Sequence, residues 1–193
     1  MVGAPKGTMI SFFNRGFFRY NESSTMDKAL KVIEEIARQG IIKTYAIGGG
    51  IAATYYIEPL LTYDLDIFFI PIKGGLDLLS PIYDYCGERG FGNKDEAILI
   101  EGFPVQFIPA YNDLVHEAVE NASTLQYRDV EARVVTAEYL AAIALQTGRA
   151  KDRERVIRLL DEADIDRTVL NRILDSFGLT ERLTKLEQQF YEE

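Results

Sequence analysis

The chain has 193 residues, of which 47% are apolar and 26% charged, proportions typical of an ordinary globular protein. Its formal net charge of −9 argues against a protein that coats nucleic acid non-specifically, and no apolar run approaches the roughly 18 residues of a membrane span. The single cysteine, Cys86, excludes an internal disulfide framework and favours a reducing cytoplasm. With one histidine, His116, a zinc site built from histidine and cysteine is not expected. His116 lies in the amphipathic run 114–119, so we predict a surface helix position for it.

Residues 1–25 differ from the rest of the chain. They carry three basic residues with no acid before Glu22, and their short aromatic run has no amphipathic period. We therefore expect 1–25 to be a flexible tail outside the fold, or an incorrectly assigned start that precedes an initiator at Met26. A helix is predicted from Ser24 or Thr25, either of which is a good N-cap, to the helix-ending Gly40.

The stretch 46–70 is the one around which the remaining elements are arranged. Residues 41–47 are apolar and β-branched, which predicts a buried strand, and the glycines 48–50 break it where the backbone must turn sharply. Residues 51–57 can form two helical turns before Glu58-Pro59 stops them. A second strand then follows over 64–70.

The rest of the chain divides by composition at Thr136. Before it we predict a turn at 73–75, a helix over 76–86 interrupted at Ser80-Pro81, a glycine-rich loop at 87–93, a hairpin of strands 97–100 and 104–108, a helix over 111–121, and short strands at 126–128 and 132–135. After it we predict four helices: 137–146 capped by Thr136, 151–162, one capped by Asp166 that ends near Gly178, and one capped by Thr180 that runs to Phe190. This order predicts an α/β (α+β) protein: a core over 26–135 with a small mixed sheet flanked by helices, then a C-terminal helical bundle over 136–193.

Two acidic residues open the second strand. Because side chains alternate along a strand, Asp64 and Asp66 face the same side, roughly 7 Å apart. Two carboxylates so placed repel each other unless a cation lies between them, and a hard cation prefers such oxygen ligands. The pair therefore indicates a metal site, and the alternative is a solvated acidic strand end.

The glycine turn is compatible with more than one phosphate-binding motif. A P-loop needs Lys-Ser/Thr after its last glycine, and Ile51-Ala52 stands there instead. The dinucleotide pattern fits Gly48-x-Gly50-x-x-Ala53 with Asp66 at about the right distance, but the acids begin a strand rather than end one. A third possibility is a nucleotidyltransferase, in which the glycines hold a nucleotide's phosphates and the paired acids hold the magnesium ion.

The last pattern resembles a known superfamily. Ile47-Gly-Gly, followed after a short helix by Thr62-x-Asp64-x-Asp66, resembles the DNA polymerase β-like nucleotidyltransferases. A strand similar to theirs at 105–108, and a segment similar to Gln146-Thr-Gly-Arg-Ala-Lys-Asp152, extend the resemblance over about residues 26–175 to the abortive-infection (AbiEii-type) toxin branch. One position departs from the pattern: Gln106 stands where the superfamily has a third metal-binding carboxylate, and it carries no charge and cannot act as a base.

The resemblance implies roles for the residues of this stretch. Asp64 and Asp66 would bind Mg²⁺, with Gln106 beside them, and the backbone N–H groups around Gly48 and Gly49 would hold the β- and γ-phosphates of a nucleoside triphosphate. Thr62, on the same strand face as Asp64, would orient a phosphate or a carboxylate; the alternative is that it only favours the strand.

A basic segment follows the first predicted helix of the C-terminal part. Residues 149–158 hold five basic and two acidic side chains. Lys151 would reach a nucleotide phosphate, and Arg149 or Arg155 the backbone of an acceptor RNA; the alternative is a solvated helix face with ion pairs four residues apart.

The sequence thus predicts a cytoplasmic, Mg²⁺-dependent enzyme that transfers a nucleotide from an NTP to an acceptor, which could be RNA. The setting that the resemblance implies is phage defence or a toxin–antitoxin pair with an antitoxin protein as partner. Because of Gln106, a nucleotide-binding or protein-interaction module that has lost catalysis is the alternative.

Overall fold

The computed structural model describes residues 25–58, 62, 64–75 and 77–191. The predicted flexible tail therefore lies outside the described residues, apart from Thr25, which begins the first helix. The described elements form a mixed α and β fold, as the sequence predicts.

A seven-stranded mixed sheet has the order β3-β4-β5-β2-β1-β7-β6. Its strands are β1 (Ile42–Ile47), β2 (Leu65–Pro71), β3 (Gly92–Lys94), β4 (Ala97–Ile100), β5 (Phe103–Pro109), β6 (Ser123–Tyr127) and β7 (Val130–Val134). At its centre β1 and β2 are antiparallel, whereas β2 is parallel to β5 and β1 is parallel to β7. The predicted hairpin of β4 and β5 is confirmed.

The antiparallel pairing of β1 and β2 decides between two interpretations of the glycine turn. A dinucleotide-binding unit joins two parallel strands through a helix that crosses over the sheet. Here Ile47 pairs with Ile67 in an antiparallel ladder, and the intervening helix is only one short element. The geometry therefore excludes the dinucleotide-binding unit at this turn.

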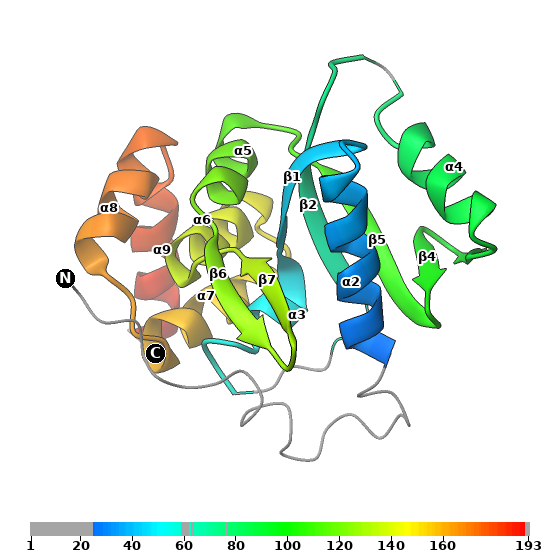
Figure 1. Ribbon diagram of the computed structural model, residues 1–193. Helices are drawn as coiled ribbons and strands as arrows, with labels where there is room; N and C mark the ends of the chain where they lie inside the picture. The colour runs from blue at the N-terminus through cyan, green and yellow to red at the C-terminus, as the bar shows by residue number, and fades with distance from the viewer. Residues whose placement is uncertain (1–24, 59–61, 63, 76, 192–193) are drawn as a thin grey trace.

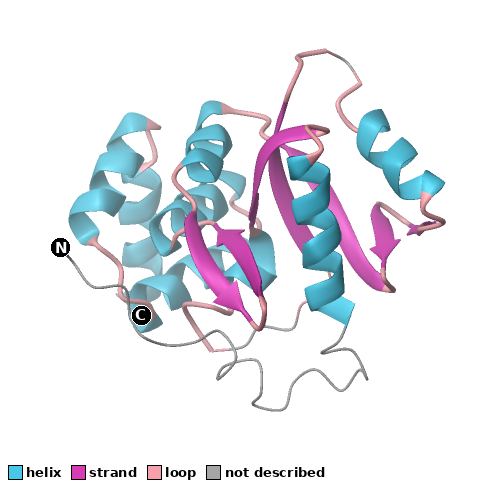
Figure 2. Cartoon of the chain, viewed as in Figure 1, coloured by secondary structure: helices cyan, strands magenta, loops and turns pink. Residues whose placement is uncertain are grey.

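Helices cover the sheet and extend beyond one end of it (Figures 1 and 2). They are α2 (Thr25–Arg38), α3 (Gly49–Ala53), α4 (Ser80–Glu88), α5 (Asp113–Glu120), α6 (Ala137–Thr147), α7 (Ala150–Glu162), α8 (Arg167–Ser176) and α9 (Thr180–Tyr191). Helix α2 lies across the sheet, whereas α6 to α9 gather at the end opposite α4 (Figure 1). Helix α6 contacts both α3 and α7, and so links the glycine turn to the C-terminal helices.

The apolar stripe of α2 positions this helix against the sheet. Leu30, Ile33 and Ile36 recur at helical spacing and are fully buried against the sheet. On β1 and β2, whose residues pack on both faces, Ile47 and Ile67 are likewise fully buried. One continuous apolar core results, with the glycine turn at its edge.

Several local predictions were wrong, among them the cap at Thr180, which is instead the first residue of α9. Ser80-Pro81 begins α4 instead of interrupting a helix, because proline is readily accommodated in the first helical turn. The loop predicted at 87–93 contains the start of β3, a short edge strand whose residues are all exposed. Helix α3 begins at Gly49 and ends at Ala53, earlier than the predicted 51–57.

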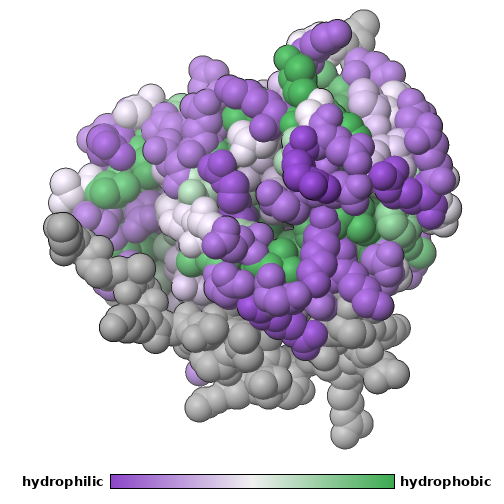
Figure 3. All heavy atoms as spheres, in the orientation of Figure 1, coloured by the Kyte–Doolittle hydropathy of each residue, from purple (hydrophilic) through white to green (hydrophobic). Residues whose placement is uncertain are grey.

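The surface of the described residues is polar on the face seen in Figure 3, where apolar side chains occur in small separate groups. His116 lies on α5 with its ring partly exposed and its Nδ1 3.7 Å from Glu120, as expected of a surface helix residue. Within the described ranges, no helix has both the length and the apolar character that crossing a membrane requires.

Candidate nucleotide-binding site

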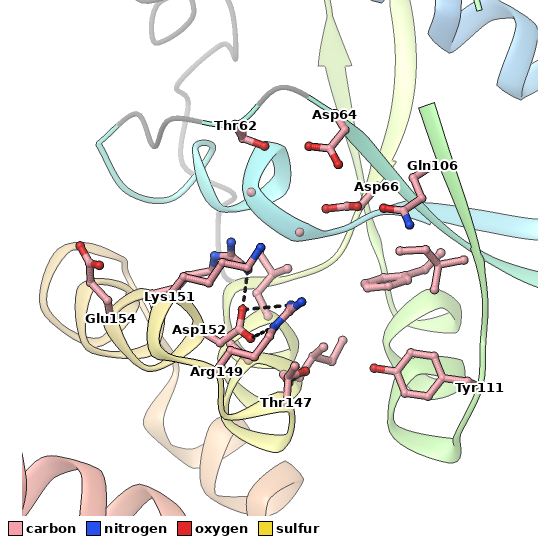
Figure 4. A pocket seen from close by; sticks show the side chains of 18 residues that line it. Thr62, Asp64, Asp66, Gln106, Tyr111, Thr147, Arg149, Lys151, Asp152 and Glu154 are labelled. Atoms are coloured by element: carbon pink, nitrogen blue, oxygen red, sulfur yellow. Dashed lines mark hydrogen bonds and ion pairs between the residues drawn. The ribbon is translucent and has the colours of Figure 1, made fainter. Parts of the chain in front are cut away.

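The acidic pair lies where β2 begins. Asp64 immediately precedes the strand and Asp66 is its second residue, so the intervening Leu65 is fully buried on the opposite side. Both acids line a cavity of about 650 Å³ between the sheet and helices α6 and α7, which we call the acidic cavity (Figure 4). Its volume is in the range of small-molecule sites.

Most of the residues predicted for the site meet around this cavity. Those that line it are Gly49, Thr62, Asp64, Asp66, Gln106, Arg149, Lys151 and Arg155. They come from four segments that are far apart in the sequence. Gly48 does not line the cavity, and the other predicted residues approach it from opposite sides (Figure 4).

The glycine turn is shaped around Asp66. The Gly48 amide donates to the Asp66 carbonyl at 2.8 Å, which extends the ladder between β1 and β2. Gly49 has φ +57°, and a Cβ added there would come within 1.6 Å of Asp66 Oδ2. The Gly50 amide donates to the Asp66 carboxylate. The amides of Gly48 and Gly50 therefore hold Asp66. Of the two amides predicted to face phosphates, that of Gly48 is already occupied within the sheet, and that of Gly49 remains a prediction.

Thr62 lies against the same turn. A Cβ added at Gly50 would approach Thr62 Oγ1 to 2.8 Å, so the absence of a side chain at Gly50 lets the threonine pack closely. Figure 4 shows the Thr62 hydroxyl on the same side of the cavity as Asp64. This hydroxyl can donate to an oxygen in the cavity or accept a hydrogen bond from it.

Asp66 is the acid of the pair whose ionisation is shifted. Burial raises the pKa of Asp66 to about 6, and repulsion from Asp64 adds to the increase. The positive charges of Arg155 and Lys151 and the hydrogen bond from Gly50 lower that pKa, but they do not cancel the effect of burial. A carboxylate pair in this environment gains from a bound cation, because the cation removes the repulsion.

Gln106 is the neighbour of Asp66 across the parallel pair of β2 and β5. Its side chain lines the acidic cavity, and its Nε2 donates to Glu96 Oε2 at 3.0 Å. The glutamine is thus beside Asp66, at the position that the resemblance assigns to a third carboxylate. In the described part of the chain, no group of three acidic, histidine or cysteine side chains is arranged to hold a metal ion.

The residues present nevertheless suit magnesium. Mg²⁺ is commonly held by one or two carboxylates together with substrate phosphates and water, rather than by a set of protein ligands alone. Asp64 and Asp66 provide two carboxylates on one face, and the cavity beside them has room for phosphate oxygens. They are the residues that would hold the ion.

The N-terminal part of α7 supplies the opposite, positively charged wall. Lys151 is exposed at the cavity and close enough to Asp66 to lower its pKa. Asp152, only 1% exposed, accepts from Arg149 Nε at 2.6 Å and lies 3.5 Å from Arg155 Nη1. Asp152 thereby holds both arginines at the cavity wall, and Figure 4 shows its contact with Arg149.

Sequence reasoning missed several of the lining residues. Asp152 is one of two acids in the basic segment, and an acid three residues from a basic residue on each side predicts such pairing. Phe68 and Ile108 follow Asp66 and Gln106 at a period of two, so strand alternation would have identified both. No local signal identifies Tyr111 or the apolar residues of α6 that line the cavity.

No protein-family model matches the sequence, and no curated protein matches it. Among solved structures, an antigenic nucleotidyltransferase-like protein from Paracoccidioides brasiliensis is similar, with a TM-score of 0.58 and 14% identity over 87% of this chain and 91% of that one. The antibiotic-resistance factor ANT(2'')-Ia also matches, with a TM-score of 0.48 and 15% identity over 89% of this chain and 97% of that one. The chain therefore has a nucleotidyltransferase-like fold, which is the fold that the sequence predicts.

Proposed function

We propose that the protein is a magnesium-dependent nucleotidyltransferase, which moves a nucleotide from an NTP to an acceptor. The observation that carries this proposal is the pair Asp64 and Asp66 on one side of β2, facing a cavity whose other wall carries Lys151 and Arg155. Carboxylates for a metal ion and cations for phosphates are the two groups that this chemistry requires. The nucleotidyltransferase-like fold supports the same class.

In this proposal the chain's own residues bind and orient the triphosphate. Asp64 and Asp66 hold Mg²⁺, which when bound neutralises phosphate charge. The Gly49 amide and the Thr62 hydroxyl face phosphate oxygens from the sheet side, and Lys151 does so from α7. Arg155 adds a second cation, and its buried Nε, which has no hydrogen-bond partner among the described residues, has an N–H left to donate to a ligand oxygen.

The reaction is a substitution at the α-phosphorus. An acceptor hydroxyl oxygen forms a bond to this atom, the bond to the bridging oxygen breaks so that pyrophosphate leaves, and the hydroxyl proton passes to water. The chain must hold the two oxygens in line and balance the charge that develops on the pyrophosphate. We assign this balance to Lys151 and Arg155, which face the acids across the acidic cavity.

The acceptor and the setting follow from the resemblance. We propose RNA as the acceptor, with Arg149 at the cavity rim as a contact to its backbone, since Arg149 has 61% of its side chain exposed while Asp152 fixes its orientation. We further propose a role in phage defence or in a toxin–antitoxin pair, with an antitoxin protein as partner, in the cytoplasm.

A nucleotide-binding or protein-interaction module without catalysis is the second candidate. Gln106 favours it, because an uncharged amide beside Asp66 leaves the pair without a third carboxylate. Such a module would bind an NTP and Mg²⁺ but release no pyrophosphate.

Incubation with each α-labelled NTP, Mg²⁺, and total cellular RNA and protein tests the proposal. We expect label in one acceptor class and release of pyrophosphate, both lost in Asp64→Asn and Asp66→Asn. Asp84→Asn, which removes an exposed acid on α4, is the matched control and should behave as wild type. Binding without incorporation would favour the second candidate, and neither binding nor incorporation would contradict both.

A further inference from the structure

The sheet face that lines the acidic cavity changes from polar to apolar along β2 and β5. The two strands are parallel, with Asp66 beside Gln106 and, two residues on, Phe68 beside Ile108. Two residues along a strand advance about 7 Å and return to the same face. A polar pair of side chains is therefore followed, on one surface, by an apolar pair.

Helix α6 provides a second apolar surface at the same place. Leu140, Ile143 and Ala144 all line the cavity and are themselves nearly buried. The charged residues of α7 lie further along the chain, toward the acids. The acidic cavity therefore has a charged part and an apolar part, and both belong to one continuous space.

Tyr111 stands at this apolar part, just after β5. Its side chain is 57% exposed, which is unusual for a large apolar residue in the described chain, where Ile72 and Phe190 are the others so exposed. Of these three, Tyr111 is the one that lines the cavity. Figure 4 shows its ring directed toward the cavity, on the side of Thr147 and Arg149 and away from Thr62 and Asp64.

We propose that the apolar part of the acidic cavity holds the nucleobase of the bound NTP, with the base stacked on the ring of Tyr111. This inference rests on the proposed function, because it takes the charged part as the triphosphate site. A nucleobase is flat and largely apolar on its faces, so it fits a space between Phe68 and α6 and stacks on an exposed aromatic ring. Phe68 lies two residues after Asp66 on the same strand, about 7 Å further along. This step keeps the base apart from the phosphates.

Stacking has a consequence for specificity. Every base presents a π-face, so a stacking site discriminates bases by the strength of stacking rather than by their hydrogen-bonding edges. We therefore expect purine triphosphates to bind more tightly than pyrimidine triphosphates, with little difference between ATP and GTP.

Calorimetric titration with ATP, CTP and inorganic tripolyphosphate, each with Mg²⁺, tests the proposal. In wild type ATP should bind more tightly than CTP, and both more tightly than tripolyphosphate. Tyr111→Ala should weaken ATP binding about ten-fold or more and leave tripolyphosphate binding unchanged. Tyr111→Phe, which keeps the ring, should bind ATP as wild type does. Ile72→Ala, which removes an apolar side chain of similar exposure (52%) just beyond the end of β2, is the control and should change nothing.

The outcomes separate this inference from the proposed function. If ATP and tripolyphosphate bind wild type equally, or if Tyr111→Ala binds ATP as wild type does, the base site is refuted while the triphosphate site stands. If Tyr111→Ala weakens both ligands equally, Tyr111 acts on the phosphates and the base site is again refuted. If neither ATP nor tripolyphosphate binds wild type, the proposed function fails and this inference fails with it.

Discussion

Asp66→Asn is expected to stabilise the metal-free protein near neutral pH. The pKa of Asp66 is about 6 in the fold against 3.8 for an ordinary aspartate, so between these pH values the folded chain binds a proton that the unfolded chain has released. Stability therefore falls as the pH rises from about 4 to about 6, and the cost is fully present above that range. Asparagine carries no charge and can still accept the hydrogen bond from Gly50, so the variant avoids the cost.

The size of the effect follows from the pKa difference. About two pH units correspond to roughly 3 kcal/mol, since each unit is worth 1.36 kcal/mol. Asp66 is partly rather than fully buried, so water screens part of this and we expect a gain of about 1–2 kcal/mol at pH 7.5. At pH 4, where the carboxyl is protonated in the fold, the gain should largely vanish.

Denaturant unfolding of wild type and Asp66→Asn at both pH values measures this difference. Asp84→Asn makes the same change in net charge at an exposed helical position and should show no pH-dependent gain. Added Mg²⁺ and NTP should stabilise wild type in proportion to RT ln(1 + [L]/Kd) and should not stabilise Asp66→Asn.

Two results would refute the reasoning. A loss of about 3–5 kcal/mol in Asp66→Asn would identify the carboxylate as one partner of a buried ion pair, with Arg155 as the nearby cation. A stabilisation by Mg²⁺ and NTP that survives the substitution would remove Asp66 from the metal site.

Three further substitutions test the walls of the cavity. Lys151→Ala should weaken NTP binding by about 1.5–3 kcal/mol in titration without changing stability, because the ammonium is exposed and, in the proposed site, would contact phosphate; unchanged affinity would return Lys151 to a solvated helix face. Gly49→Ala should destabilise more than Gly90→Ala: both glycines have positive φ, which costs about 1–2 kcal/mol, but the space at Gly90 is open whereas the added Cβ at Gly49 meets Asp66. Equal losses in denaturant unfolding would show that Asp66 moves aside freely. Gln106→Asp should destabilise the metal-free fold by repulsion from Asp66 and Glu96 and should tighten Mg²⁺ binding; the absence of any Mg²⁺-dependent difference in thermal unfolding would place residue 106 away from the metal.

The elements around the site could be predicted because their signals are local. The strand before the glycines, the acids that open β2 and the hairpin of β4 and β5 depend on residue type and on a period of two. Gln106 was identified from the resemblance, and the register of β2 and β5 confirms that it lies beside Asp66.

The rest of the site depends on packing between distant segments. That Asp152 is buried between two arginines, and that residues of α6 line the same cavity as Phe68, follows from how the C-terminal helices meet the sheet. Local patterns predict that these helices exist but not against which surface they pack. Gly48 is a second example. The sequence predicts that it lies in the turn, but its N–H donates to Asp66 because β1 and β2 pair, which local patterns do not predict.

The uncharged amide of Gln106 bears on the order in which ligands bind. With two carboxylates at the cation position and an amide beside them, the protein supplies less negative charge than a set of three acids would. The missing charge can come from the triphosphate itself, which is the usual arrangement when Mg²⁺ keeps few protein ligands. If the proposed function holds, we expect metal and nucleotide to stabilise the fold mainly when both are present, because each supplies charge that the other needs. For this reason Mg²⁺ and NTP are added together when the stability of Asp66→Asn is measured. The stabilisation by both ligands together, compared with the sum of their separate effects, measures how strongly binding at the acids of β2 depends on binding at the charged wall of α7.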